Sequence, residues 1–394
     1  MLVVVAPGQG TQTPGFLTPW LDVPGVAERL DWLSLVSGIN LRAHGTTSDA
    51  DTIRDTAIAQ PLIVGAGLVT LLSLFPHPSA AFASIGAGAG HSVGEITAAV
   101  GAGVLTAEQA MVFVRERGIA MAKASAVTAT GMAAVLGGNQ EDVIAAASQA
   151  GLTCANINGA GQIVVAGTKA QLDNFVAPEG ARVRALEVAG AFHTEHMASA
   201  SATLGRIGNA MSTHDPRIRL ISNADGQIVH DGRAVVRRLV SQVAQPVRWD
   251  LCMQTMLDLG VTAMIEIPPA GTLTNLAKRA MPGVETLALK TPDDLPAAWK
   301  LIEKHGVKSM IETSPTWRLV ISPAKGIFTS ADSTYAEGDS LQPNVHIGSI
   351  KTSRELIPIH APHGGVVIEW LAQDGDPVSP GAPLLRLHPT AQPA

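Results

Sequence analysis

A serine flanked by glycines is the clearest chemical signal in this sequence. Gly90-His91-Ser92-Val93-Gly94 follows a run of small residues and precedes a segment of helical character. G-x-S-x-G between a strand and a helix is typical of a nucleophile elbow, a sharp turn that exposes the serine hydroxyl. The start of the following helix favours developing negative charge, and the Val93 N–H is the natural oxyanion donor. Because a glycine-rich turn with a capping serine fits the motif equally well, a partner base is needed.

The best candidate for that base is His193. It stands in Gly190-Ala191-Phe192-His193-Thr194-Glu195-His196, after a predicted strand and before a predicted helix. Loops at such positions often carry the site residues of α/β domains, although a single histidine is more often a surface or core residue. His193 and His196 could also bind a metal. An i,i+3 pair without a third ligand is weak support, so we predict no metal site.

Two further polar residues stand in apolar or glycine-rich surroundings. Gln9 lies between two glycines after the first predicted strand, where backbone and amide groups can approach a ligand closely. Arg117 falls on a mostly apolar face of the predicted helix 107–125, together with Phe113. A buried guanidinium requires an anion, and its planar fork suits a carboxylate. A turn without function at Gln9 and an internal salt bridge at Arg117 remain open alternatives.

The elements that must position these residues alternate between short apolar strands and alanine-rich helices up to about residue 290. This alternation predicts an α/β layered domain with a largely parallel sheet. The apolar run 61–75 is too short to cross a bilayer and is expected to be a buried helix. The predicted strands are 2–6, 162–166, 182–188, 219–222 and 263–267, and the predicted helices are 92–101, 107–125, 140–150 and 234–243.

Residues 130–188 have the pattern of a self-contained subdomain. The predicted order of strand, helix, strand, strand, helix and strand is that of the ferredoxin-like motif. We expect this subdomain to be inserted into a larger α/β domain made of residues 1–129 and 189–290. Residues 291–316 are more polar and punctuated by prolines, which predicts a linker with a short helix.

The remaining residues, 317–394, contain a weak internal repeat. Ser322–Phe328 is similar to Ala361–Val367, and Glu337–Pro343 is similar to Asp374–Pro380. Two similar β units predict a small pseudo-symmetric β domain, with the Gly-Asp steps as tight turns between strands.

The composition excludes several classes of function. Of the 394 residues, 46% are hydrophobic and 15% are charged, which rules out general disorder. A formal net charge of −6 leaves no basic surplus for binding nucleic acid. Cys154 and Cys252 are too few for a disulfide framework or a structural zinc site. Because the N-terminus also lacks the basic segment of a signal peptide, we expect a reduced, cytoplasmic protein with no membrane partner.

Taken together, these residues resemble the malonyl-CoA:acyl-carrier-protein transacylase family of type II fatty-acid synthesis. The resemblance covers residues 1 to about 290 and implies an α/β, hydrolase-like large domain with a parallel sheet, a nucleophile elbow and an inserted ferredoxin-like subdomain. Ordered blocks are far more specific than the serine motif alone. They are GQGTQ (8–12), GHSVGE (90–95), RERGIAM (115–121), GMAAVLG (131–137), NINGAGQIVVAG (156–167), GAFHTEHM (190–197), SNADG (222–226), QVAQPVRWD (242–250) and EIPPAGTLTNLAKR (266–279).

The resemblance implies catalytic roles for five matching residues. Ser92 matches the acyl-accepting nucleophile, and His193 matches its base. Gln9 and the Val93 N–H match the oxyanion hole. The backbone carbonyl of Gln242 matches the group that orients the histidine, so the implied machinery is a Ser-His dyad without a carboxylate member.

The resemblance also implies the substrate contacts and the reaction. Arg117 matches the residue that holds the free carboxylate of the malonyl group, and His91 lies near the bound acyl group. Ala191-Phe192 is similar to the malonyl-selective form of its loop. The implied reaction is ping-pong transfer of malonyl from malonyl-CoA to the phosphopantetheine thiol of acyl carrier protein, with no bound cofactor or metal.

The C-terminal residues resemble a biotinyl/lipoyl-attachment domain, which implies a small all-β barrel. Ala361-Pro362-His363-Gly364-Gly365 fits the strand that opens A-P-x-x-G in such domains. The acceptor lysine is expected about seven residues earlier, where Arg354 stands, and Lys351 is three residues out of register. Since arginine cannot be biotinylated or lipoylated, we expect an unmodified domain that docks other fatty-acid synthesis proteins.

Two other functions stay open. A serine hydrolase or thioesterase would share the serine, the histidine and the oxyanion hole, but usually adds a carboxylate to the triad and has no need of Arg117. A non-catalytic scaffold would have no reason to keep Ser92, His193, Gln9 and Arg117 together.

The carrier-protein site is expected in the groove between the large domain and residues 130–188. Carrier proteins are acidic, so Lys123, Arg182 and Arg184 are candidate contacts, although such residues are usually part of a solvated surface.

Overall fold

A mostly parallel sheet forms the centre of the first of two structural units, Met1–Ser309. The computed structural model of the chain describes residues 1–188, 190–306, 318–331 and 335–388. The strand order is β11-β10-β1-β2-β7-β8, and every pairing is parallel except that of β7 with β8. The predicted α/β layers are confirmed. The strands are β1 (Leu2–Ala6), β2 (Ala87–Gly90), β7 (Arg219–Ile221), β8 (Ile228–Val229), β10 (Ala263–Glu266) and β11 (Glu285–Ala288).

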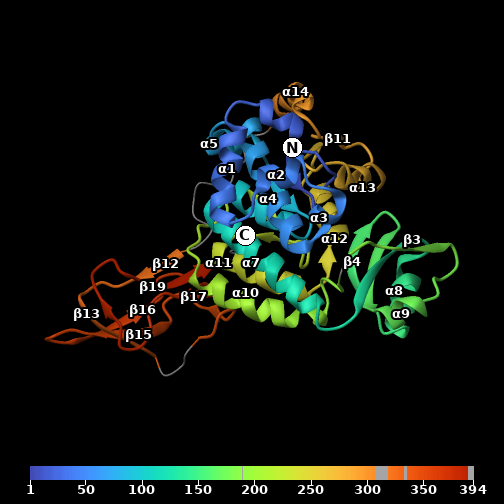
Figure 1. Cartoon of the computed structure of the whole chain (residues 1–394). Helices are drawn as coiled ribbons and strands as arrows, with labels where there is room; N and C mark the ends of the chain where they lie inside the picture. Colours follow the sequence, from blue (N-terminus) through green and yellow to red (C-terminus); the bar gives the residue numbers. More distant parts are fainter. Residues whose placement is uncertain (189, 307–317, 332–334, 389–394) are drawn as a thin grey trace. The chain divides into compact units, whose positions relative to one another are not determined.

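Helices cover both faces of this sheet (Figure 1). Along β1, Val4 faces the cluster formed with α4, α6 and α7, whereas Val3 and Val5 face α12 and α13. Strands buried on both faces read as continuous apolar runs, as LVVVA does. The helices are α1 (Val26–Ser37), α2 (Leu41–Thr46), α3 (Ala50–Arg54), α4 (Thr56–Leu74), α5 (Pro78–Ser84), α6 (Gly94–Gly101), α7 (Ala107–Ser125), α10 (Ala198–Ala210), α11 (Gly232–Ser241), α12 (Trp249–Asp258), α13 (Thr272–Ala280) and α14 (Leu295–His305), with short 3₁₀ turns η1 (Thr18–Asp22), η2 (Glu195–Met197), η3 (Gln242–Ala244) and η4 (Pro292–Asp294).

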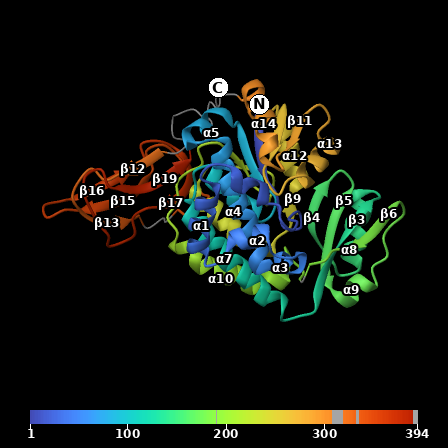
Figure 2. The same ribbon diagram turned by 45° about the horizontal axis from the view of Figure 1, so that its top comes forward.

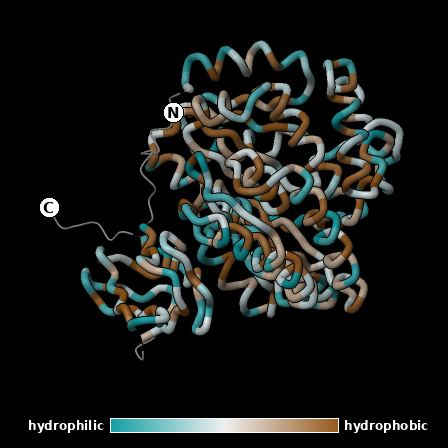
Figure 3. Tube along the Cα trace, turned by 90° about the vertical axis from the view of Figure 1, so that its left-hand side faces the viewer, coloured by the Kyte–Doolittle hydropathy of each residue, from teal (hydrophilic) through white to brown (hydrophobic). Residues whose placement is uncertain are grey.

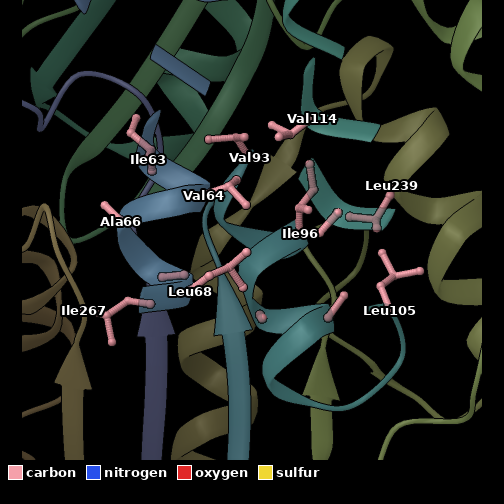
Figure 4. Packing of buried hydrophobic residues seen from close by; sticks show 14 of the residues in the cluster. Ile63, Val64, Ala66, Leu68, Val93, Ile96, Leu105, Val114, Leu239 and Ile267 are labelled. Carbon is pink, nitrogen blue, oxygen red and sulfur yellow. The ribbon is translucent and has the colours of Figure 1, made fainter. Parts of the chain in front are cut away.

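Helix α4 contains all but the last residue of the apolar run 61–75, which is the buried part of the helix as expected. It begins at Thr56 because the Asp55 side chain accepts a hydrogen bond from the Ala57 N–H and caps the helix. By length and composition α4 could cross a membrane, but 72% of its most apolar window is buried within the protein. Figure 4 shows side chains of α4, α6 and α7, among them Val64 and Val114, meeting in one apolar cluster. The helix is therefore a core element, as predicted.

A second sheet is formed by the segment predicted to be ferredoxin-like. Its order is β6-β3-β5-β4-β9, antiparallel except where β9 (Val247–Arg248) joins β4 in parallel. Figure 1 and Figure 2 show this part, mostly green, beside the parallel sheet and close to α12. Its elements are β3 (Thr130–Gly137), α8 (Gln140–Gln149), β4 (Thr153–Gly159), β5 (Gln162–Thr168), α9 (Lys169–Asp173) and β6 (Ala181–Ala185).

The order of these elements is the predicted one, but two of them end early. Helix α9 stops at Asp173, whereas the sequence predicted a helix over residues 169–176. Strand β6 stops at Ala185 and not at Val188, because the Val188 N–H turns back to the Leu186 carbonyl at 2.9 Å.

Part of the predicted linker belongs to the first unit. Residues 292–305 form η4 and α14, and Leu295, Ala298 and Leu301 of α14 are buried in the main core. The spacing of these residues gives the helix one apolar face. This face is buried against the core, whereas in a linker it would be exposed to water. The other end of the predicted linker, residues 307–316, lies outside the described residues.

The second unit, Met310–Ala394, consists of two antiparallel sheets in its described part. Their orders are β12-β19-β17-β14 and β16-β15-β13-β18. Figure 3 shows that apolar and polar residues alternate over short distances along the strands of this unit. The apolar residues lie on one face of each sheet and are buried in a common cluster. The strands are β12 (Arg318–Ile321), β13 (Gly326–Ser330), β14 (Ser340–Leu341), β15 (His346–Lys351), β16 (Leu356–His360), β17 (Gly365–Trp370), β18 (Pro377–Val378) and β19 (Pro383–His388).

The two sheets are related in the way the internal repeat predicts. The repeat aligns β13 with β17 and β14 with β18, and these strands hold matching places in the two sheets. Matching hydrogen bonds join them: the Phe328 N–H donates to the Asp376 carbonyl at 3.0 Å, and the Val367 N–H to the Asp339 carbonyl at 2.8 Å. The pseudo-symmetry is therefore present, while closure into a barrel stays a prediction.

Candidate active site

Ser92 occupies a strained turn between β2 and α6. Its φ is +52°, in the left-handed region that residues with a Cβ rarely adopt. The turn is held by a hydrogen bond of 2.7 Å from the Ser92 N–H to Oδ1 of Asn223. Strain of this kind clusters at functional sites, where it persists because the surroundings hold it. The backbone thus has the geometry of a nucleophile elbow.

The two glycines of the motif allow strand and helix to touch backbone to backbone. A Cβ on Gly90 would lie 2.0 Å from the Gly94 carbonyl carbon, and a Cβ on Gly94 would lie 2.3 Å from the Ala6 carbonyl oxygen. No side chain fits at either position, because the obstacle is main chain that cannot rotate away. The elbow therefore depends on these two glycines for space.

Gly94→Ala is expected to lower the free energy of unfolding by about 3 kcal/mol or more, since overpacking against backbone cannot relax. Chemical denaturation of the purified variant measures this change. Gly205→Ala is the matched control, because a Cβ there has its nearest neighbour, Val240, at 3.9 Å in an ordinary helix. The control is expected to gain about 0.5 to 1 kcal/mol. Equal stability of Gly94→Ala and wild type would contradict the packing argument.

His193 is placed directly against the serine. Its Nε2 lies 2.7 Å from the Ser92 Oγ, and its Nδ1 lies 2.7 Å from the backbone oxygen of Gln242. Because a carbonyl only accepts, Nδ1 carries the proton and Nε2 presents its lone pair to the serine hydroxyl. The imidazole is 3% exposed and has a φ of +61°, so its position is set by the surrounding protein.

The surroundings also keep this imidazole neutral. Burial, followed by the nearby charge of Arg117, lowers the pKa of His193 to about 3, although the hydrogen bond to Gln242 acts in the opposite direction. A histidine with such a pKa is deprotonated at neutral pH and is ready to accept a proton.

Arg117 is a buried cation beside the serine, as its position on the apolar face of α7 predicted. It is 1% exposed, with Nη1 2.5 Å from Oε1 of Gln60 and Nη2 2.9 Å from Oε1 of Gln242. Nη2 is also 3.4 Å from the Ser92 Oγ. Among the described residues its hydrogen-bond partners are neutral, and its buried Nε has none. Burial lowers the pKa of Arg117 to about 10, so it remains charged at neutral pH. The site therefore contains a buried cation whose Nε has no hydrogen-bond partner among the described residues.

Gln242 connects these groups through both its backbone and its side chain. In addition to holding His193, its Nε2 donates to the Ser92 carbonyl at 3.0 Å and to a carboxylate oxygen of Glu95. The sequence predicted only the carbonyl contact. Residues Glu95 and Asn223 were missed, although they belong to the GHSVGE and SNADG blocks. The signal available for Glu95 was a carboxylate at the start of an otherwise apolar helix, GEITAAVG, whereas Asn223 gave no such signal among its polar neighbours.

The two predicted oxyanion donors have backbone N–H groups that are not used within the described part of the protein. The backbone N–H groups of Val93 and Gln9 donate to no acceptor within the described ranges. The side chain of Gln9 is turned elsewhere, with Nε2 3.3 Å from the Arg54 carbonyl and 3.4 Å from Oγ1 of Thr56. The expectation that the Gln9 amide group itself faces the ligand is therefore wrong for the side chain, which finds partners where α3 meets α4.

His91 directly precedes Ser92 in the sequence, and Phe192 directly precedes His193. His91 Nε2 is 2.8 Å from Oδ1 of Asn158 on β4, and its ring contacts the edge of Trp249 with centroids 5.7 Å apart. Burial lowers the pKa of His91, so it is neutral. Phe192 is 7% exposed and packs in the main core. The smaller sheet thus contacts the residue that precedes the serine.

The remaining candidates lie away from this centre. Lys123, Arg182 and Arg184 are exposed, the two arginines on one face of edge strand β6. A search of the described residues finds no group of three His, Cys, Asp or Glu side chains able to hold a metal ion. A cavity of about 330 Å³ lies beside α4, α5 and α6, is lined mainly by apolar side chains, and includes neither Ser92 nor His193.

Comparison with known proteins gives one consistent result. Residues 3–291 match the sequence model of the acyl transferase domain. A malonyl CoA-acyl carrier protein transacylase from Mycobacterium tuberculosis is 47% identical over 302 residues, which cover 75% of this chain and 98% of that protein. The crystal structure of MCAT from the same organism has a TM-score of 0.73 at 46% identity and covers 75% of this chain and 99% of that one.

A further solved structure is described as a type II PKS acyl-carrier protein in complex with its malonyl-transacylase. It has a TM-score of 0.71 at 26% identity and covers 76% of this chain and 99% of that one.

Proposed function

This chain belongs to the malonyl CoA-acyl carrier protein transacylase family, and we propose that it transfers malonyl from malonyl-CoA to the phosphopantetheine thiol of an acyl carrier protein. One observation carries the proposal. The Ser92 Oγ lies 2.7 Å from Nε2 of a neutral His193 and 3.4 Å from Nη2 of Arg117. The guanidinium of Arg117 is buried, and its hydrogen-bond partners among the described residues are uncharged. A nucleophile, a base and a carboxylate receptor are what acyl transfer from malonyl-CoA requires.

In the first half-reaction, His193 Nε2 takes the hydroxyl proton as Ser92 Oγ attacks the thioester carbonyl. The resulting oxyanion accepts hydrogen bonds from the N–H groups of Val93 and Gln9, each worth ~3 kcal/mol in such sites. The Gln242 carbonyl stabilises the imidazolium through Nδ1–H. His193 then gives its proton to the departing sulfur, so CoA leaves as a thiol and malonyl-Ser92 remains.

The second half-reaction reverses these steps with a different thiol. His193, neutral again, accepts the proton of the phosphopantetheine thiol as its sulfur attacks the serine ester. The tetrahedral intermediate collapses, malonyl moves to the carrier protein, and Ser92 recovers its proton from His193. The chemistry uses only side chains and substrates, which is why we propose a Ser-His dyad without a bound cofactor.

Arg117 is proposed to select the acyl group. Its unpartnered Nε and its Nη2 can donate to a carboxylate two carbons beyond the ester carbonyl of an acylated Ser92. An acetyl group offers no anion there and leaves the buried charge uncompensated. His91 and Phe192 are proposed to form the wall around the acyl group, Phe192 in the loop form associated with malonyl over methylmalonyl.

The second unit is proposed to be an unmodified relative of biotinyl/lipoyl domains that docks other fatty-acid synthesis proteins. The pseudo-symmetric sheets support this fold. At the β15–β16 hairpin, Arg354 lies in the turn, whereas Lys351 pairs with Leu356 within the ladder. The mycobacterial relative is matched over 98% of its length by residues that make up 75% of this chain. Transfer is therefore proposed to need only the first unit.

The carrier protein is proposed to approach along the edge strand β6. Arg182 and Arg184 expose two cations on one face there, and Lys123 exposes a third on α7. An acidic partner would be attracted to these groups. We place the whole reaction in the cytoplasm, where malonyl-CoA and carrier protein meet.

The proposed function predicts a malonyl-enzyme that forms and then empties. Intact-protein mass after brief mixing with malonyl-CoA is expected to show one malonyl adduct. Acetyl-CoA is expected to give about 100-fold less acyl adduct, because the acetyl group offers no carboxylate to pair with Arg117. Adding carrier protein should remove the adduct and add the same mass to the carrier. Release of free malonate at the same rate without carrier would point to a hydrolase instead. Absence of both adduct and turnover would leave a scaffold.

A further inference from the structure

Glu95 is a buried carboxylate that the mechanism above does not use. It lies in the first turn of α6, three residues after the nucleophile, and is 6% exposed. Its Oε1 accepts a hydrogen bond of 2.6 Å from the Asn223 N–H, and its Oε2 accepts one from the side-chain amide of Gln242. Each oxygen therefore faces an N–H donor, an arrangement that suits the ionised form.

These two contacts determine how the neighbouring amides are oriented. Because Nε2 of Gln242 is directed to Glu95 and to the Ser92 carbonyl, its Oε1 is directed to Nη2 of Arg117 at 2.9 Å. A carboxylate only accepts hydrogen bonds, so it decides which end of the amide faces the guanidinium.

The second contact reaches the nucleophile. Asn223 is fully buried; its Oδ1 accepts from the Ser92 N–H at 2.7 Å, and its Nδ2 donates to the Gly90 carbonyl at 2.7 Å. Glu95 holds the backbone of Asn223 and thereby the strained turn at Ser92. One carboxylate is thus connected to both the nucleophile and the carboxylate receptor.

We propose that Glu95 is a positioning residue that, through Gln242 and Asn223, orients Arg117 and Ser92, and that its protonation is what limits malonyl transfer on the acid side. This inference rests on the proposed function. It concerns a residue that touches neither substrate nor the reacting atoms.

A proton on Glu95 would disturb the network at either oxygen. On Oε2 it would oppose the N–H of Gln242, and the amide would have to turn its Oε1 toward Glu95. Its NH₂ group would then face the N–H donors of Arg117, which would lose an acceptor. On Oε1 the proton would oppose the Asn223 N–H that supports the serine turn.

Glu95 also has access to protons. A cavity of about 250 Å³ borders it, lined among others by Arg238 of α11, Gln245 and Arg248 of β9. Since neither Ser92 nor His193 lines this cavity, protons can reach the carboxylate without passing the nucleophile.

The charged groups around Glu95 come from several elements. Arg117 faces it from α7 and Arg238 from α11, and both favour the ionised carboxylate. Arg238 is itself paired with Asp225 at 2.6 Å, and Arg248 on the cavity wall is paired with Asp250 at 2.9 Å. The buried thiol of Cys252 on α12 is neutral, because burial raises its pKa.

The result of these opposing effects is a carboxyl group that titrates near neutrality. Burial is the largest effect and raises the pKa of Glu95 to about 7, while its hydrogen bonds and Arg238 act against it. The pKa of His193, at about 3, is too low for the base to titrate in this range. Activity should therefore be present above pH 7 and fall as the pH drops below it, with Glu95 responsible.

The test measures the rate of malonyl-Ser92 formation from malonyl-CoA between pH 5.5 and 9 by rapid quench and intact mass. For wild type we expect the rate to fall about tenfold per pH unit well below pH 7, as for one essential ionisation. Glu95→Gln, in which the amide imitates the protonated acid, should be about 10- to 100-fold slower at pH 8.5 and flat across the range. Arg238→Gln should move the acid limb to higher pH.

Several outcomes would overturn the inference. Glu95→Gln with the wild-type acid limb would assign that limb to another group, and a uniform loss with the limb retained would mean a merely structural role. If Glu95→Gln does not fold, the Arg238→Gln variant gives the answer: an acid limb at the same pH as in wild type would also overturn the inference. Asp258→Asn, an exposed carboxylate on α12, controls for general charge effects and should keep the wild-type profile. A wild type that forms no malonyl adduct at any pH would refute the proposed function instead.

Discussion

Replacing Ser92 with alanine is expected to eliminate the malonyl-enzyme and to lower malonyl transfer by about 10⁴-fold or more, because no covalent intermediate can form. The substitution removes only the oxygen that lies 2.7 Å from His193 Nε2. The Ser92 N–H that bonds to Asn223 stays in place, so the turn should keep its shape. Intact mass after mixing with malonyl-CoA detects the adduct, and transfer to carrier protein gives the rate.

A second serine provides the control for this prediction. Ser201 on α10 bonds to the Val240 carbonyl at 3.2 Å, outside the network around the nucleophile. Ser201→Ala should give a full malonyl adduct at the wild-type rate. An adduct of normal mass on Ser92→Ala would mean that another residue accepts the acyl group, and the elbow would then have no catalytic role.

Replacing Arg117 with methionine is expected to reverse the preference among acyl groups. Malonyl-enzyme formation should fall about 100-fold or more, since a charge-assisted pair with the malonyl carboxylate is lost in a water-poor site. Acetyl-enzyme formation should rise, because no uncompensated charge is left beside the acyl group. The ratio of the two acylation rates, measured with both acyl-CoAs under the same conditions, is the informative quantity.

The control for Arg117 lies two residues earlier in the same helix. Arg115 is 34% exposed and paired with Glu116 at 2.8 Å, so Arg115→Met should leave the malonyl-to-acetyl ratio unchanged. The hydrogen-bond partners of Arg117 among the described residues are neutral, but the carboxylate of Glu95 lies close enough to interact with its charge. Thermal unfolding of Arg117→Met therefore checks whether loss of the charge destabilises the fold. Equal losses with both acyl-CoAs would show that Arg117 supports the structure without selecting the carboxylate.

Local features of this protein follow from short stretches of sequence. Helix α7 spans Ala107–Ser125 as predicted, because Thr106 and Gln109 form a capping box at its start and its apolar face is regular. The repeat in the second unit predicted matching strands because similar strand and turn residues recur after 39 and 37 residues. The two glycines and the serine within five residues predicted a turn, but it was the ordered set of family blocks that distinguished an elbow from a turn with a capping serine.

Other features depended on contacts between distant segments. Gln242 lies 147 residues from Glu95, and Asn223 lies 131 residues from Ser92, so no local pattern relates these partners. The direction of the Gln9 side chain and the packing of α14 on the core were likewise decided by what lies nearby in space. Sequence alone thus determined the elements and the chemistry of individual residues. Only the tertiary structure decided which buried polar atoms satisfy one another, because a hydrogen bond depends on distance and direction in three dimensions.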